Sequence, residues 1–132
     1  RLGRLKGKAD RVLVDAPCSG LGTLRRNPDL KYRQSPETLA KLAEQQHSIL
    51  NAAAELVKPQ GRLVYATCSI LPQENEGQIE RFLREHPDFE ALNCADLPGS
   101  LKISPDTYLK LDTATHGTDG FFAAVLQRRE TV

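Results

Sequence analysis

The chain has 132 residues, of which 39% are hydrophobic and 27% charged, and its formal net charge is +1. These values fit one folded domain and exclude a disordered or collagen-like chain. Because no apolar run approaches the roughly 18 residues that a membrane-spanning helix needs, we expect no membrane partner. Three cysteines without close spacing argue against a disulfide framework, and they favour reduced thiols and a cytoplasmic location.

Charge is distributed unevenly along the chain. Residues 1–33 contain nine Lys or Arg and three Asp, a net charge of +6, whereas residues 34–132 contain nine basic and fourteen acidic residues, a net charge of −5. A basic segment of this kind either faces a phosphate backbone or forms a solvated flank and loop. Charge alone leaves both interpretations open.

The N-terminal quarter predicts one strand between two irregular segments. Residues 1–9 alternate basic residues with glycine and leucine and predict a flexible basic segment. Arg11–Asp15 is a short apolar run, typical of a strand that is buried on both faces of a parallel sheet. Pro17 ends this run, and the glycines and basic residues of 20–33 predict a loop.

A long amphipathic helix follows that loop. Ser35 is a favourable N-cap, and Pro36 occupies the first helical position. The apolar stripe of the helix is interrupted only by Gln46, and His47 lies on the polar side, where we expect it at the surface. The run Lys58-Pro59-Gln60-Gly61 predicts the end of the helix.

The rest of the chain alternates strands with a second helix. That helix opens at Pro72 and is stopped by Pro87, with His86 near its end. The expected strands are Arg62–Thr67, Phe89–Leu92, Tyr108–Leu111 and Gly120–Gln127. This alternation predicts an α/β fold with an open, mostly parallel sheet.

Two predicted strands end in similar sequences. Asp15 is followed by Cys18-Ser19 after the first strand, and Cys68-Ser69 follows the second. Because the carboxyl ends of neighbouring parallel strands meet at one edge of a sheet, we expect both thiols and the carboxylate to converge. A thiolate is a strong nucleophile, although a lone cysteine at a strand end is often only a small buried residue. No Cys/His spacing fits a metal site.

Four sequence blocks carry a family resemblance that extends from Asp10 to Arg128, and their order along the chain is part of it. They resemble the NOL1/NOP2/Sun family of RNA (cytosine-5) methyltransferases, and within it the bacterial enzymes that modify small-subunit ribosomal RNA. The blocks are Asp15-Ala16-Pro17-Cys18-Ser19-Gly20 with Arg25-Arg26-Asn27-Pro28-Asp29-Leu30-Lys31-Tyr32, Leu63–Ser69, Glu74-Asn75-Glu76, and His116–Phe122.

The resemblance implies a Rossmann-like fold with an antiparallel last strand, and S-adenosylmethionine as the cofactor. It implies that Cys68 attacks C6 of a cytosine in ribosomal RNA and that Cys18 assists release of the methylated product. Asp15 and Pro17 would lie on the cofactor side of the site, with Asp15 also at the N3 edge of the base. This is covalent catalysis with electrostatic stabilisation, and it requires an unpaired or flipped base.

RNA contacts are expected from the loop after the first strand. The basic residues Arg25, Arg26, Lys31 and Arg33 are the candidates for phosphate binding, with a solvated loop as the alternative. Three other functions stay open: a non-catalytic RNA-binding module of the same fold, a Cys/His hydrolase that uses His116, and a small-molecule methyltransferase. Retention of Cys68 and Asp15 argues against the first of these.

The resemblance also implies parts that the 132 residues do not contain. The glycine-rich cofactor loop and the N-terminal RNA-binding region of the family are absent, and the first residue is Arg1. We therefore interpret residues 10–132 as the C-terminal half of a catalytic domain. Alone, this chain is expected to be inactive and to bind S-adenosylmethionine weakly or not at all. The outer edge of the first strand, with Val12 and Val14, is expected to be bare, paired with another molecule or covered by the N-terminal tail.

Overall fold

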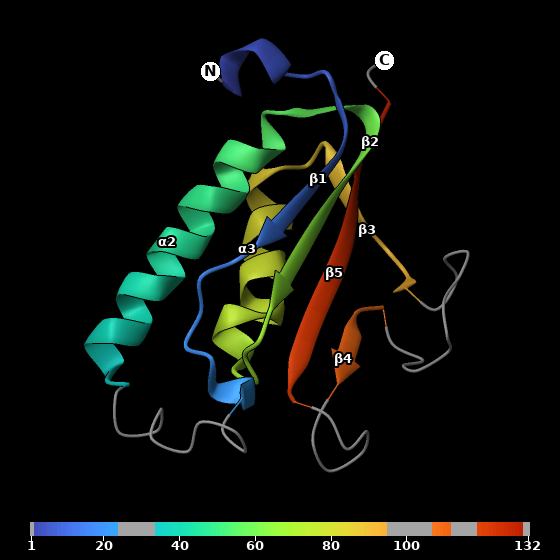
Figure 1. Cartoon of the computed structure of the whole chain (residues 1–132). Coiled ribbons are helices and arrows are strands. Elements are labelled where there is room, and N and C mark those ends of the chain that lie inside the picture. Colours follow the sequence, from blue (N-terminus) through green and yellow to red (C-terminus); the bar gives the residue numbers. More distant parts are fainter. Residues whose placement is uncertain (1, 24–33, 95–106, 112–118, 131–132) are drawn as a thin grey trace.

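The structure is a computed structural model, and it describes residues 2–23, 34–94, 107–111 and 119–130 (Figure 1). The two α-helices are α2 (Pro36–Ala54) and α3 (Glu76–Glu85), and single turns of 3-10 helix lie at Leu2–Leu5, Leu21–Thr23 and Pro72–Glu74. The strands are β1 (Ala9–Asp15), β2 (Val57–Thr67), β3 (Phe89–Leu92), β4 (Leu109–Leu111) and β5 (Phe121–Arg128). None of the helices in these ranges is long and apolar enough to cross a membrane.

The strands form one mixed sheet in the order β1-β2-β5-β3, with β4 also paired to β5. Strands β1 and β2 are parallel, whereas β5 is antiparallel to each of β2, β3 and β4. Four of the described strands therefore run in one direction, and β5 runs in the other. This confirms the predicted α/β fold, mostly parallel with an antiparallel last strand.

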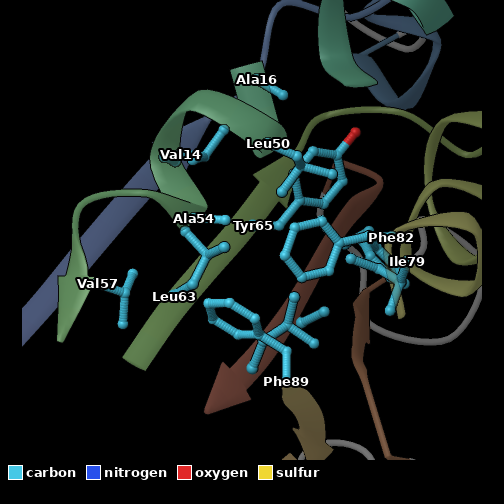
Figure 2. Close-up of a cluster of buried hydrophobic side chains, with 14 residues drawn as sticks. Val14, Ala16, Leu50, Ala54, Val57, Leu63, Tyr65, Ile79, Phe82 and Phe89 are labelled. Atoms are coloured by element: carbon cyan, nitrogen blue, oxygen red, sulfur yellow. The ribbon is translucent and has the colours of Figure 1, made fainter. Parts of the chain in front are cut away.

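The hydrophobic core lies between one face of the sheet and the two helices (Figure 2). Alternate residues of β2 and β5 point into it, as the period of two along a strand requires. Phe82 of α3 meets Phe89 of β3 edge to face, with 5.2 Å between the ring centroids. The largest fully buried apolar side chains are Tyr65, Phe82, Phe122, Leu50, Leu63, Ile79, Leu126 and Val57.

Strand β1 is not buried on both faces as its apolar run predicts. Val14 points into the core, but the side chain of Leu13 on the other face is 70% exposed. Within the described residues, the outer backbone edge of β1 has no strand partner. The side chains of Val12 and Val14, which the prediction placed at this edge, pack on the core instead.

Helix α2 begins where the sequence predicts and ends earlier. Ser35 caps it, because its hydroxyl accepts a hydrogen bond from the Thr38 amide and the Thr38 hydroxyl accepts one from the Ser35 amide. The helix ends at Ala54, so the prediction that Lys58–Gly61 ends it is wrong. Those residues belong to β2, where Gln60 adopts a positive φ of 68° beside a shift in register with β1.

The described N-terminal residues hydrogen-bond the segment that joins α2 to β2. Residues 2–5 form a 3-10 turn, and the amides of Gly7 and Ala9 bond the carbonyls of Glu55 and Leu56.

His47 is only 9% exposed, and the prediction of a surface position is wrong because α3 covers that side of α2. Its Nε2 lies 3.2 Å from Glu85 of α3 and 3.2 Å from the Asn51 amide. His86 ends α3 as expected, with its amide bonded to the Phe82 carbonyl.

Candidate active site

The two Cys-Ser sequences lie side by side at the carboxyl ends of β1 and β2. The backbone of Cys68 and that of Gly20 both hydrogen-bond the thiol of Cys18. The hydroxyls of Ser19 and Ser69 are 3.4 Å apart. The two Cys-Ser turns therefore lie together at one edge of the sheet, and the approach of the Asp15 carboxylate to the two thiols stays a prediction.

The buried carboxylate of Glu74 accepts hydrogen bonds from both Cys-Ser turns. Its Oε1 accepts hydrogen bonds from the Ser19 amide at 2.8 Å and from the Gln46 side chain at 3.3 Å. Its Oε2 accepts from the Ser19 hydroxyl at 2.8 Å and from the Ser69 hydroxyl. Glu74 is 0% exposed, so these four donors satisfy a carboxylate that solvent does not reach.

Asn75 fixes the backbone on both sides of Cys68. Its Oδ1 accepts a hydrogen bond from the Thr67 hydroxyl at 2.6 Å, and its Nδ2 donates to the Ser69 carbonyl at 2.8 Å. Thr67 and Ser69 are buried, whereas Cys68 between them is exposed. The two anchors thus present the Cys68 side chain outward from the end of β2.

Two glycines allow three segments to meet directly behind the cysteines. The Gly22 amide bonds the Cys68 carbonyl at 2.8 Å, and the Gly22 carbonyl accepts from the Gly120 amide at 2.7 Å. A Cβ on Gly22 would lie 2.4 Å from the Cys68 carbonyl oxygen and 2.5 Å from that of Gly120. Only glycine permits this approach, and it links the loop before β5 to the site.

The two thiols have different surroundings. Cys18 is half-buried, and this burial raises the pKa of its thiol. Hydrogen bonds from the backbone of Gly20 and Cys68 lower this pKa in part, and the nearby Glu74 carboxylate raises it. Burial also raises the pKa of Tyr65, whose hydroxyl donates to the Glu74 carbonyl at 2.7 Å.

Asp15 and Pro17 are both exposed where β1 ends. Pro17 lines a pocket of about 480 Å³ together with Glu44, Gln45, Ser48 and Ile49 of α2. The implied cofactor, S-adenosylmethionine, has a heteroaromatic adenine ring, a sulfonium, and amino and carboxyl groups. Pro17 and Ile49 could contact the ring and Glu44 the amino group, but Asp15 does not line this pocket, so cofactor binding here stays a prediction.

A second pocket, of about 200 Å³, opens beside Ser69 and Ile70. Phe121, Leu111 and the exposed Ile70 provide its apolar walls. Lys110 reaches Glu76 at 3.2 Å on its polar side. The two residues that follow Cys68 therefore line this pocket, whose walls contain both apolar and charged groups.

The predicted RNA-binding residues Arg25, Arg26, Lys31 and Arg33 lie outside the described residues, and so does His116. Cys94, the third cysteine, is half-buried. Within the ranges that the structure describes, no three His, Cys, Asp or Glu side chains are grouped as a metal site requires.

Sequence reasoning did not identify Glu74 and Asn75 as site residues. Glu74 reads as an acid that stabilises a helix start, because acidic residues are common in first turns. The only signal in the sequence is that Glu74-Asn75-Glu76 is one of the four blocks that carry the family resemblance.

Solved structures show the class of protein that this fold defines. The chain superposes on the crystal structure of PH0851 with a TM-score of 0.82 and 38% identity, covering 93% of this chain and 27% of that one. It superposes on NSun6 from Pyrococcus horikoshii, determined with SFG, with a TM-score of 0.78 and 30% identity, covering 98% and 33%. The domain therefore has the Rossmann-like methyltransferase fold.

The particular family follows from sequence. The chain belongs to the 16S rRNA methyltransferase RsmB/F family, whose model matches residues 3–127. It is 48% identical over 121 residues to a probable ribosomal RNA small subunit methyltransferase B of Synechocystis, covering 90% of this chain and 27% of the relative. The Sodalis glossinidius methyltransferase B is 56% identical over 117 residues, covering 87% and 25%. The chain thus spans about a quarter of the length of these relatives.

Proposed function

We propose that the protein containing these residues methylates C5 of a cytosine in small-subunit ribosomal RNA, in the cytoplasm. Support comes from the names of the relatives and from the paired thiols of Cys18 and Cys68 at one edge of the sheet. S-Adenosylmethionine is the proposed methyl donor, and SFG in the NSun6 structure is an analogue of it. Asp15 and Pro17 would hold it at the end of β1.

The proposed chemistry begins at Cys68. Its thiolate adds to C6 of the cytosine, the C5–C6 double bond opens, and the electron pair makes C5 nucleophilic. A proton held at N3 by Asp15 neutralises the charge that develops on the ring. S-Adenosylmethionine, when bound, would supply an electrophilic methyl group to C5, with the thioether S-adenosylhomocysteine as the leaving group.

Release reverses the first addition. C5 loses its proton to a base, the bond between C6 and the Cys68 sulfur breaks with its electron pair returning to that sulfur, and the C5–C6 double bond re-forms, with Cys18 assisting this elimination. The assignment of roles follows the family resemblance of the Thr67-Cys68 and Pro17-Cys18 sequences. Its structural support is that Cys68 is exposed, as attack on a base requires, whereas Cys18 is half-buried and burial raises the pKa of its thiol.

The test uses the complete reading frame with Cys68→Ala, Cys18→Ala and, as the matched control, Cys94→Ser. Cys68→Ala is expected to remove methylation and the covalent RNA adduct, with turnover reduced at least about 1,000-fold. Cys18→Ala is expected to accumulate that adduct, which migrates as a shifted band on a denaturing gel. The reverse pattern would exchange the two roles. Absence of 5-methylcytosine from small-subunit RNA with the unmodified enzyme would contradict the proposal.

The proposal includes weak cofactor binding by the 132 residues alone, because they contain no glycine-rich cofactor loop. Calorimetric titration of this chain with S-adenosylmethionine is expected to give no measurable heat at micromolar concentrations. Micromolar affinity would contradict this part of the proposal and leave the roles of the cysteines untouched.

A further inference from the structure

We infer that Glu74 is a positioning residue that sets the separation of the Cys18 and Cys68 thiols by holding the serine after each of them. This inference rests on the proposed function of those two cysteines. It concerns the reaction only through their geometry, since Glu74 is fully buried and touches neither RNA nor cofactor.

The contacts around Glu74 connect segments that are far apart in sequence. Ser19, which is bonded to Cys18, donates both its amide and its hydroxyl to the carboxylate, at 2.8 Å each. Ser69, which is bonded to Cys68, donates its hydroxyl to the same Oε2 atom. One carboxylate therefore holds both residues that follow the cysteines.

Two further side chains hold Glu74, one at its backbone carbonyl and one at its carboxylate. Tyr65 of β2 donates its hydroxyl to the Glu74 carbonyl at 2.7 Å. Gln46 of α2 donates to Oε1 at 3.3 Å and also to the Pro17 carbonyl at 2.9 Å. Cys18 is thus flanked by Pro17, held through Gln46, and by Ser19, held through Glu74. Because peptide units are planar and stiff, fixing both neighbours restricts the residue between them.

The chemistry of the network separates a conservative substitution from a disruptive one. In Glu74→Gln, the amide oxygen can accept from the Ser19 amide and from Gln46. The new NH₂ group can donate to the two serine hydroxyls, which are able to accept as well as donate. Glu74→Ala removes all four acceptor positions and leaves buried donors unpaired. Glu74→Asp keeps the charge, but its shorter side chain cannot reach both serines.

The first test measures the two thiols without RNA or cofactor. Dibromobimane becomes fluorescent when both of its arms have alkylated thiols, and peptide mass spectrometry identifies the Cys18–Cys68 product. In the complete protein, Glu74→Gln is expected to crosslink at the unmodified rate. Glu74→Ala and Glu74→Asp are expected to be slowed at least about fivefold, as a displacement near 1 Å implies.

Asn51→Ala is the matched control. Asn51 links His47 to His86 between α2 and α3, so its loss lowers stability without touching either cysteine turn. The control is expected to leave the crosslinking rate unchanged. If Glu74→Ala does not fold, Glu74→Asp together with Ser69→Ala, which removes only one donor, carries the same comparison.

The second test is turnover on RNA. Glu74→Asp is expected to lower kcat at least about tenfold with KM for RNA changed less than twofold, and Glu74→Gln is expected to restore most of kcat. Crosslinking of Glu74→Asp and Ser69→Ala at the unmodified rate would overturn the inference, and so would a Glu74→Gln variant as slow as Glu74→Asp. Failure of the unmodified enzyme to methylate RNA, with crosslinking still dependent on Glu74, would contradict the proposed function instead.

Discussion

The two Cys-Ser turns have the same dipeptide at equivalent strand ends, yet the structure gives them different environments. Cys68 follows β2 directly and is exposed between two buried residues. Cys18 lies three residues beyond β1 in a loop that turns back at Gly20, where φ is 72°, and it is half-buried. The same dipeptide thus has an exposed thiol in one turn and a half-buried thiol in the other.

The proposed function assigns the two thiols separate tasks, and their surroundings differ. Desolvation by burial raises the pKa of the Cys18 thiol. The exposed side chain of Cys68 is free to approach a base. The shared Glu74 carboxylate keeps the two thiols in a fixed relation while their surroundings differ.

The largest effect on this arrangement is expected from Gly22→Ala. The added Cβ would lie within 2.5 Å of two backbone oxygens, which cannot rotate away, so the Cys68 segment must shift. We expect a loss of about 3 kcal/mol in the free energy of unfolding, measured by urea denaturation. Gly3→Ala is the matched control, since nothing lies within 4 Å of its Cβ position. Equal stability of the two variants would contradict the close approach.

A smaller effect, restricted to the Cys68 turn, is expected from Asn75→Asp. The carboxylate still accepts from Thr67, but its second oxygen faces the Ser69 carbonyl where an amide donated before. We expect a loss of about 2 kcal/mol in the free energy of unfolding and a changed alkylation rate at Cys68 only. The control is Gln73→Glu, the same type of change at an exposed position. Equal changes at both cysteines would argue against separate anchoring.

The smallest effect is expected in the pH dependence of Cys18. Because burial raises its pKa in the folded state, the folded protein retains the thiol proton at pH values where the unfolded chain loses it. Stability should therefore fall as pH rises above about 8.5, the ordinary value for cysteine, and Cys18→Ser should remove this part of the decline. Iodoacetamide labelling followed by mass spectrometry should show Cys18 reacting only at higher pH. Alkylation of Cys18 with the profile of a free thiol would contradict the burial effect.

Much of the fold could be predicted because the decisive signals are local. Ser35 and Pro36 predict the start of α2, and the structure places the N-cap at Ser35. The apolar runs also locate the strands. The end of α2 could not be predicted in this way. Lys58–Gly61 has the composition of a helix stop, but pairing of β1 with Val57 draws this segment into β2.

For the candidate site too, some features could be predicted from the sequence and others could not. The approach of Cys18 to Cys68 could be predicted because parallel strands bring their ends together. The roles of Glu74 and the burial of His47 could not. Both depend on how α3 and the turn before it pack against α2, which involves partners separated by 28 to 55 residues. The periodicity of one helix does not show which other segment packs against it.

Strand β5 has a consequence for how the domain assembles during synthesis. It comes last among the described strands, yet it pairs with β2, β3 and β4 at once. Within the described chain, β3 and β4 have no other strand to pair with, so neither can join the sheet until Phe121–Arg128 has left the ribosome. Such long-range closure slows folding and leaves apolar edges exposed to chaperones in the meantime.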